Sequence, residues 1–403
     1  MNSVLFAIII LLPALAWADI VISRPEVTSH VTVRTSASSQ SSKLGELRPG
    51  QSLPYAGSVS RWHKVELPGN QTGFVSKRWT TVKDATASFF STEAFTVHFL
   101  DVGVGDAAII DIGDREVIID GGNYINDIYD YITETGIVDG PIELAIVTHG
   151  DQDHWKGLSR LLGHDRVVDN PYEVLEYWDP GYDRDCNLPA RPTGRANYLA
   201  FVEKVKQSLA PQQFKRPLEN FHPPMDQTGN LSVFSIPSIP EIRFTVLHSE
   251  ASPAQTSCSY MINNASIVLM VEIDGIRMLF TGDANGKGRQ ELTDAGASHV
   301  EKQLLDAANL IGEGVLQANL LKVPHHGSET ANTQDFIKAV NPDYVIISAA
   351  TNHHLPKQTV IDRYISPQRV ILRTDRNHAR MRDHIICGKT EGVFDCQYAS
   401  NIN

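Results

Sequence analysis

THGDQDHWKG, residues 148–157, is the stretch of sequence that decides the fold. It follows an apolar run, ELAIV at 143–147, which predicts a buried strand that ends where the polar cluster begins. Imidazole and carboxylate side chains together suit divalent ions such as zinc, manganese or iron. A loop that is rich in Asp and His by chance is the alternative, and four such residues within six positions disfavour it. The four residues are His149, Asp151, Asp153 and His154.

The same pattern recurs along the chain, because other apolar, β-rich runs also end at Asp or His beside Gly. FLDVGVGDAAIIDIGDREVIIDGG (99–122) predicts short strands, the last of which ends at Asp120. A sheet that gathers strand ends at one edge would bring these groups into a single site. The other runs are MLFTGD (278–283), LLKVPHHGS (320–328) and VIISAATNHHLP (345–356), which end at Asp283, at His325 and His326, and at His353 and His354.

These motifs, in this order, resemble the metallo-β-lactamase superfamily: HxDxDH, then TGD, then VPHHGS. In detail they are similar to the hydrolase domain of ComEC-type DNA-uptake (competence) proteins. FLDVGVGDA (99–107) resembles the opening of that domain, which usually carries Gln at the position of Val104, and INNASIVL (262–269) and SAATNHHLP (348–356) resemble two further motifs. The likeness covers about 95–390 and implies an αββα sandwich with metals at one rim.

The resemblance implies two divalent metal ions, zinc or manganese, and a water molecule that they activate. His149 and Asp151 would hold the first ion, Asp153, His154 and His325 the second, and Asp283 would bridge them. Most of the superfamily has His at the position of Asp151, so the carboxylate favours manganese or another oxygen-preferring ion. The third histidine of the usual first site is missing. Its place falls at Asn263 or Asn264, and His248 is the nearest histidine, either as a ligand or as a supporting residue.

The resemblance also implies roles around the metals. Asp153 would orient the nucleophile as well as bind metal, while Asp120 and His326 would each fix a ligand. Ser328 and the backbone of Gly327 would contact a phosphate. Either His353 or His354 would donate a proton to the leaving group, and the other would be structural.

Three function classes follow. The first is an exported metal-dependent phosphodiesterase or nuclease, which acts on a phosphodiester or nucleic-acid substrate. The second is a lactonase or a β-lactam, ester or amide hydrolase of the same superfamily. The third is a non-catalytic wall-binding protein. The absence of an apolar run of ~20 residues after the N-terminus argues against a DNA transporter.

Residues 1–18 predict a signal peptide, because an apolar stretch is followed by Ala16-Trp17-Ala18. The protein is therefore expected to be secreted or periplasmic; an uncleaved anchor is the alternative. The net charge of −12 argues against a broad electrostatic grip on nucleic acid. One basic cluster near the C-terminus fits either phosphate binding or an ordinary solvated surface: Arg373, Arg376, Arg380 and Arg382.

Residues 20–81 resemble a bacterial SH3-like domain, through the VTVR opening (31–34), the LRPGQ turn (47–51) and GFVSKRW (73–79). This resemblance implies binding of cell-wall glycan or a peptide. The aromatic residues of the module would line a groove or fill its core. They are Tyr55, Trp62, Phe74 and Trp79.

A linker is predicted at 82–94 and the hydrolase domain at 95–398. An insert at about 168–227 would carry a helix near 197–209, and a second helix is expected at 289–308. None of the four cysteines lies in a CxxC motif, so no structural zinc is indicated. Cys387 and Cys396 flank a predicted hairpin and form the favoured disulfide; Cys186 and Cys258 would pair or remain free.

Overall fold

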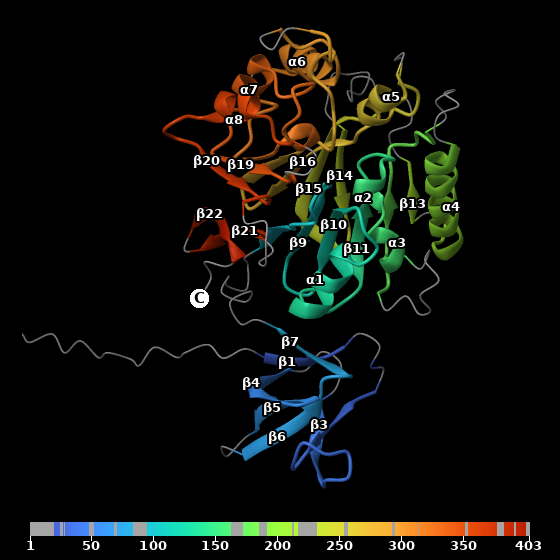
Figure 1. Cartoon of the computed structure of the whole chain (residues 1–403), viewed down its shortest axis with the longest axis vertical. Coiled ribbons are helices and arrows are strands. Elements are labelled where there is room, and N and C mark those ends of the chain that lie inside the picture. Colours follow the sequence, from blue (N-terminus) through green and yellow to red (C-terminus); the bar gives the residue numbers. More distant parts are fainter. Residues whose placement is uncertain are drawn as a thin grey trace, which may run out of the picture. The chain divides into compact units, whose positions relative to one another are not determined.

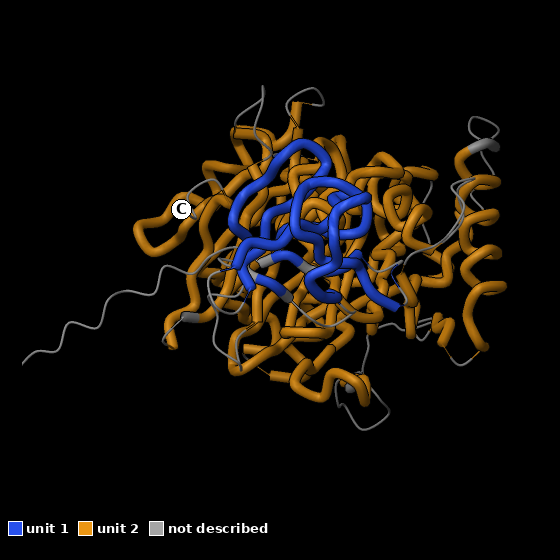
Figure 2. Tube along the Cα trace, turned by 90° about the horizontal axis from the view of Figure 1, so that it is seen from below, with its two compact units in different colours: residues 1–88 blue, residues 89–403 orange. Residues whose placement is uncertain are grey.

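The chain divides into two compact units, residues 1–88 and 89–403 (Figure 2). Each unit has its own sheets and its own apolar core. The computed structural model describes residues 20–24, 27, 29–47, 52–67, 71–83, 95–162, 172–184, 192–211, 213–216, 232–253, 257–291, 295–312, 314–350, 354–376, 383–390 and 392–399.

The first unit is a small all-β barrel in which seven strands follow the order β3-β2-β6-β5-β4-β1-β7. Its buried core is aliphatic and contains Val31, Val33, Val65 and Val75. Alternation of buried and exposed residues along β2, β5 and β6 places these valines inside. The strands are β1 (Ile20–Ser23), β2 (Val31–Arg34), β3 (Lys43–Leu47), β4 (Ser52–Val59), β5 (Trp62–Leu67), β6 (Gln71–Ser76) and β7 (Thr80–Lys83).

The second unit contains two sheets whose inner faces pack together. Their strands are Val-, Ile- and Leu-rich, and the central ones are buried along their whole length, as expected where both faces of a sheet are covered. The first sheet has the order β13-β12-β11-β10-β9-β8-β21-β22. Its strands are β8 (Thr96–Phe99), β9 (Ala107–Asp111), β10 (Glu116–Gly121), β11 (Ile142–Ile146), β12 (Tyr177–Trp178), β13 (Phe214–Lys215), β21 (Ile385–Thr390) and β22 (Val393–Tyr398).

The second sheet runs in the order β14-β15-β16-β17-β18-β19-β20. Phe99 and Leu144 of the first sheet share a core with Phe244, Leu269 and Phe280 of the second. The strands of the second sheet are β14 (Ser232–Ile236), β15 (Ile239–His248), β16 (Val268–Ile273), β17 (Ile276–Phe280), β18 (Leu320–Lys322), β19 (Tyr344–Ile347) and β20 (Val370–Arg373).

Helices cover the outer face of each sheet, which completes the predicted αββα sandwich (Figure 1). Over the first sheet lie α1 (Asp127–Thr135), α2 (Gln152–Trp155), α3 (Leu158–Leu161) and α4 (Pro192–Ser208). Over the second lie α6 (Val300–Ile311), α7 (Gln334–Val340) and α8 (Gln358–Tyr364). The short α5 (Cys258–Asn264) packs on Tyr182 of the insert.

The helix expected near 197–209 is present as α4, which buries Tyr198, Phe201, Val202 and Val205 on one side. The helix expected at 289–308 is shorter than predicted, because it begins only at Val300. Before it, the amides of Ser298 and Glu301 bond to the carbonyls of Gly286 and Asn285, so the chain is tied to the TGDANG loop there and follows a non-helical path.

The hairpin of β21 and β22 confirms the favoured disulfide, since Cys387 and Cys396 face each other across it and are bonded. Cys186, the partner considered for Cys258, lies outside the described residues, as does the predicted signal peptide. Among the residues that the structure describes, no helix is both long and apolar enough to span a membrane.

Candidate metal centre

The candidate centre lies between the two sheets, where the carboxyl ends of two pairs of parallel strands meet: β10 and β11 of the first sheet, and β17 and β18 of the second. Asp120 ends β10, and His149 follows β11, two strands that pair in parallel. Asp283 follows β17, and the turn with His325 and His326 follows β18, its parallel neighbour. Ligands commonly bind at the carboxyl ends of parallel strands, and here both sheets contribute to the same edge.

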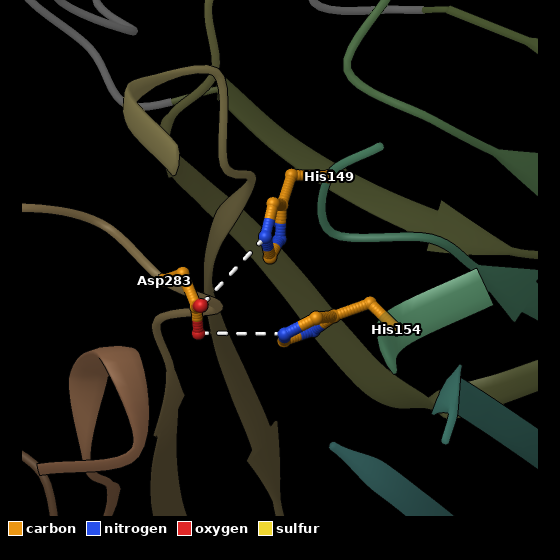
Figure 3. Close-up of side chains that lie close together, drawn as sticks. All are labelled: His149, His154 and Asp283. Atoms are coloured by element: carbon orange, nitrogen blue, oxygen red, sulfur yellow. Dashed lines mark ion pairs between the residues drawn. The ribbon is translucent and has the colours of Figure 1, made fainter. Parts of the chain in front are cut away.

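Three histidines and one carboxylate converge at this edge, and Figure 3 shows two of the histidines, His149 and His154, with Asp283. Nε2 of His149 lies 3.8 Å from Oδ2 of Asp283, and Nε2 of His154 lies 3.4 Å from its Oδ1. Nε2 of His326 lies 3.3 Å from the same Oδ1. Asp283 therefore presents one oxygen to His149 and the other to His154 and His326, as the predicted bridging ligand would.

The remaining predicted ligands divide into two sides. We call His149 and Asp151 the His149 side: their Nε2 and Oδ2 atoms are 3.9 Å apart. We call Asp153, His154 and His326 the His326 side: Oδ2 of Asp153 lies 3.6 Å from Nε2 of His326, and the three residues form one group that could hold an ion. Asp283 lies between the two sides.

The structure places His326, and not His325, in the predicted position of the second-site histidine. His326 is buried and forms a possible metal-binding group with Asp153 and His154, whereas the side chain of His325 is 21% exposed and its Nε2 lies 3.9 Å from Oδ2 of Asp283, on the side of His149. Nδ1 of His325 lies instead 3.0 Å from Oγ1 of Thr330. The two histidines point apart because both adopt left-handed backbone angles (φ 48° and 51°), a strained conformation that is frequent at functional sites.

Buried groups behind the His326 side fix its histidines. Nδ1 of His154 is 2.7 Å from Oδ2 of Asp120, whose oxygens also accept hydrogen bonds from the amide and hydroxyl of Thr148. Nδ1 of His326 is 3.0 Å from the carbonyl of Ser348. With Nδ1 engaged in this way, Nε2 of each ring is free to face the centre.

Asp106 also supports the His326 side, although the sequence patterns did not single it out. Its Oδ1 lies 3.3 Å from Nδ1 of His326, and it forms an ion pair with Lys322, which is buried at the end of β18. The amide of Asp106 donates to the carbonyl of Asp153. This close approach requires Gly105, since a Cβ there would lie 2.2 Å from that carbonyl oxygen.

The His149 side is supported by a cation and an amide. Arg184, from the insert, lies with Nη2 3.2 Å from Oδ1 of Asp151, and its Nη1 donates to the carbonyl of Gly150. The Asn263 amide, with its nitrogen turned towards the acceptors, donates to Oδ2 of Asp151 at 3.3 Å. Arg216 holds the segment that carries Arg184 through ion pairs to Asp179 and Asp183. No motif in the sequence pointed to Arg184.

The protonation of the centre follows from its charges. Burial lowers the pKa of His154 and His326, but the carboxylates of Asp283, Asp120 and Asp106 outweigh burial and raise both pKa values well above the usual range. For His149 burial prevails, and its pKa falls well below the usual range. Burial raises the pKa of Asp151 to about 6 against the opposing effect of Arg184.

The centre is built to accept cations. Nε2 of His149, His154 and His326 and Oδ1 of Asp283 are buried and make no hydrogen bond within the described part of the chain, yet Nε2 of His154 and of His326 faces this Oδ1, and Nε2 of His149 faces the other oxygen of Asp283. Buried polar atoms without partners are rare unless a ligand or ion satisfies them. Five carboxylates and only two basic side chains meet here, which leaves three negative charges when the histidines are neutral. The carboxylates are Asp106, Asp120, Asp151, Asp153 and Asp283, and the basic residues are Arg184 and Lys322.

The other predicted site residues surround the centre at different depths. Nδ1 of His248 lies 2.9 Å from the carbonyl of Ser266, whose hydroxyl accepts from the amide of Asp283; His248 thus supports the bridging loop. The hydroxyls of Ser328 and Thr330 are 3.0 Å apart. His354 is exposed, and His353 lies outside the described residues.

The basic cluster near the C-terminus is only partly described. Arg373 makes two hydrogen bonds to Asp375, and Arg376 lies over the ring of Tyr398. Arg380 and Arg382 lie outside the described residues.

Comparisons with known proteins agree with both parts of the architecture. Residues 29–81 match the model of the bacterial SH3 domain. The chain is 25% identical over 303 residues to ComE operon protein 3 of Bacillus subtilis (strain 168), an alignment that covers 70% of this chain and 32% of that protein. It is 31% identical over 121 residues to competence protein ComA of Neisseria gonorrhoeae, covering 29% of this chain and 15% of that protein. The chain thus spans at most about a third of these relatives.

A solved metallo-β-lactamase from Hirschia baltica is also similar, at 17% identity and a TM-score of 0.32, over 62% of this chain and 93% of that one. At that score the comparison adds little to the sheet order and layers described above. Those layers, the ordered motifs and the sequence relatives agree with one another. The chain thus contains a region that matches the bacterial SH3 domain, followed by an αββα domain that is similar to part of ComE operon protein 3 and has the layers expected of the metallo-β-lactamase fold.

Proposed function

We propose that the protein is an exported, metal-dependent phosphodiesterase or nuclease. The observation that carries the proposal is the convergence of four buried ligand atoms, on His149, His154, His326 and Asp283, that make no hydrogen bond within the described residues. A merely structural cluster of this kind would bury these atoms with only the ion pairs to Asp283 as compensation. The residues fit divalent ions, and the resemblance to ComEC-type proteins favours a phosphodiester over a carboxylic ester or amide.

In this proposal the His149 side, the His326 side and Asp283 hold two divalent cations, with His326 in the role first expected of His325. With cations bound, such a centre supplies an activated water and neutralises charge that develops on the substrate. The carboxylate of Asp151 favours manganese, whereas the histidines also suit zinc. Asp120, Asp106 and Ser348 hold the rings of His154 and His326 in place.

Chain residues beside the ligands would handle the substrate. Arg184 lies at the partly exposed His149 side, where a guanidinium can pair with a phosphate oxygen. Ser328 and the amide of Gly327 are proposed as phosphate contacts. The proton donor to the leaving group is proposed to be His354 or His353, on the loop after β19.

The first unit is proposed to bind a ligand and not to catalyse. Within the described part of the chain, every group of residues that could hold a metal lies in the second unit. The proposed division is therefore a signal peptide at 1–18, a binding module at 20–81, a linker at 82–94 and a hydrolase domain at 95–398.

A substrate panel tests the proposal. Purified protein is assayed with manganese and with zinc on bis-p-nitrophenyl phosphate and on single- and double-stranded DNA, beside nitrocefin and a lactone. We expect metal-dependent cleavage of the phosphodiesters, which Asp283→Ala abolishes. Turnover of the lactone or nitrocefin alone would transfer the assignment to the second function class, and no turnover by a metal-loaded protein would favour the third.

A further inference from the structure

The barrel segment, residues 20–83, and the rest of the chain carry opposite charges. Residues 20–83 contain nine Lys and Arg against three Asp and Glu, a net charge of +6. The whole chain carries −12, so the remainder carries −18. An asymmetry of this size between two parts of one chain indicates that the basic part has an anionic partner.

Strand register places cations beside an aromatic ring on the outer face of the barrel. Phe74 of β6 is directly opposite Lys64 of β5 and Arg34 of β2. Residues that alternate with them, such as Val33 and Val65, point into the core, so Arg34, Lys64 and Phe74 share the outward face. Trp62 lies two residues along β5 from Lys64 on that face, opposite Ser76.

The turn after β6 extends this surface. The amide of Lys77 donates to the carbonyl of Arg61, which brings the turn against the tip of the β4–β5 hairpin. Trp79 is 41% exposed, and the guanidinium of Arg78 lies 4.8 Å from the centre of its ring. We call the whole set the basic–aromatic face: Arg34, Arg61, Trp62, Lys64, Phe74, Lys77, Arg78 and Trp79.

Little within the described part of the chain neutralises this face. Arg61, Lys64, Lys77 and Arg78 form no ion pair there. Glu46 is engaged with Lys43 and lies 3.6 Å from His30. Glu66, two residues along β5 from Lys64, is the remaining described acid of the barrel. Cations thus lie opposite Phe74 and over Trp79, and Trp62 lies two residues from Lys64, the neighbour of Phe74, on the same strand face. None of these three rings belongs to the buried core, which is aliphatic.

We propose that the basic–aromatic face binds single-stranded nucleic acid. Lys and Arg would contact backbone phosphates, while unpaired bases would stack on Trp62, Phe74 and Trp79, the combination by which small β-barrels hold single strands. A wall glycan, the ligand first expected for this module, offers neither planar bases nor a phosphate at every repeat. The inference rests on the barrel's own surface and stands whether or not the second unit cleaves phosphodiesters.

Fluorescence polarisation with the full-length protein tests the inference. The probe is a labelled oligothymidylate of about 20 nucleotides, longer than the site of one small barrel. Chelator removes metal, so that cleavage does not interfere. We expect the double variant Lys77→Ala/Arg78→Ala to weaken binding at least about tenfold and to reduce the slope of log K against log salt by about 1.4, that is ~0.7 per lost phosphate contact. Trp79→Ala should weaken binding roughly 5- to 100-fold.

Two controls make the outcomes decisive. Arg243→Ala/Lys302→Ala removes two exposed cations from the second unit and should leave binding unchanged. Asp283→Ala should keep full binding while losing activity, which separates this inference from the proposed function. The inference is wrong if wild-type protein does not bind the probe at low salt, or if the barrel variants bind as wild type. Binding to purified peptidoglycan that the same variants lose, without binding to the oligonucleotide, would assign the face to the wall.

Discussion

The two sides of the candidate metal centre are supported in different ways. On the His326 side, both histidines are buried and are held from behind by carboxylates and a carbonyl, which orient them towards the centre; its carboxylate, Asp153, is 23% exposed. On the His149 side, the side chain of Asp151 is 30% exposed and is held by Arg184 at Oδ1 and by Asn263 at Oδ2, which would compete with a metal ion for these oxygens. Ligands oriented by buried acceptors bind metal better than ligands that must first be released from a cation. The two sides should therefore differ in metal affinity.

The largest effect is expected where the two sides meet. Asp283→Ala removes the carboxylate that faces both, so we expect loss of nearly all bound metal and a fall in activity of at least about a thousandfold. Elemental analysis of the purified protein measures the bound metal, and the phosphodiester assay measures the activity. Asp274→Asn is the matched control: it removes the charge of an exposed carboxylate paired with Lys389 at the far end of the same β16–β17 hairpin, keeps a residue that tolerates the left-handed backbone there (φ 49°), and should behave as wild type. Normal metal content in Asp283→Ala would mean that the centre has been misidentified.

The second prediction compares two adjacent histidines. His326→Ala should remove most of the metal from the His326 side and reduce activity by about two to three orders of magnitude, because its Nε2 faces Asp283 and Asp153. His325→Ala should cost about tenfold or less and leave metal content near normal. The opposite ranking would restore the assignment made from the sequence motif.

The contrast between these histidines shows what sequence could and could not predict. Strand ends carrying Asp120, His149 and Asp283 were predictable, because apolar runs stop at acids or histidines beside glycine and a sheet must bring such ends together. The choice between His325 and His326 was not, because it depends on two consecutive left-handed residues in the turn. Adjacent positions in a motif do not reveal which ring turns inward.

Other features escaped prediction for similar reasons. Arg184 lies in a segment whose sequence shows no helix or strand periodicity. Its position depends on the ion pairs that Arg216, farther along the chain, makes with Asp179 and Asp183. Lys322 is an isolated charge in an apolar strand, and only its pairing with Asp106 shows why it is there. By contrast, the Cys387–Cys396 bond was predictable, since a short hairpin places its flanking residues opposite each other.

Metal removal should expose the difference in affinity. On dialysis against a weak chelator, the His149 side should lose its metal first, leaving about one equivalent bound and most of the activity gone. Added manganese should restore activity, with an affinity at least about tenfold weaker than that of the retained ion. Two ions lost together in one step, or two that both resist the chelator, would show that the sides are equivalent.

The smallest effect is a dependence of stability on pH in the metal-free protein. The pKa values of His154 and His326 are raised well above 6.5, so the stability that these residues contribute as cations is complete below about pH 6.5 and is lost as pH rises through their folded pKa values. The pKa of His149 is lowered, so this residue is neutral in the folded and the unfolded protein above about pH 6.5, and its contribution to stability does not change with pH there. Glu301 also titrates in this region, because burial raises its pKa to about 7. To measure above its titration, we set the pH window of the experiment from about 7.5 to 9.

Within that window, the melting temperature of chelator-treated protein should fall as pH rises. The increase in melting temperature that added metal produces should become larger as pH rises, because metal cations then supply the positive charge that the deprotonated histidines no longer carry. Differential scanning fluorimetry with and without metal measures both trends. Asp120→Asn removes a carboxylate that raises the pKa of His154, so its metal-free protein should show a shallower fall. A melting temperature that is flat or rises with pH in metal-free wild type would show that the two histidines are neutral in the folded protein, and the contrast between the sides would then rest on geometry alone.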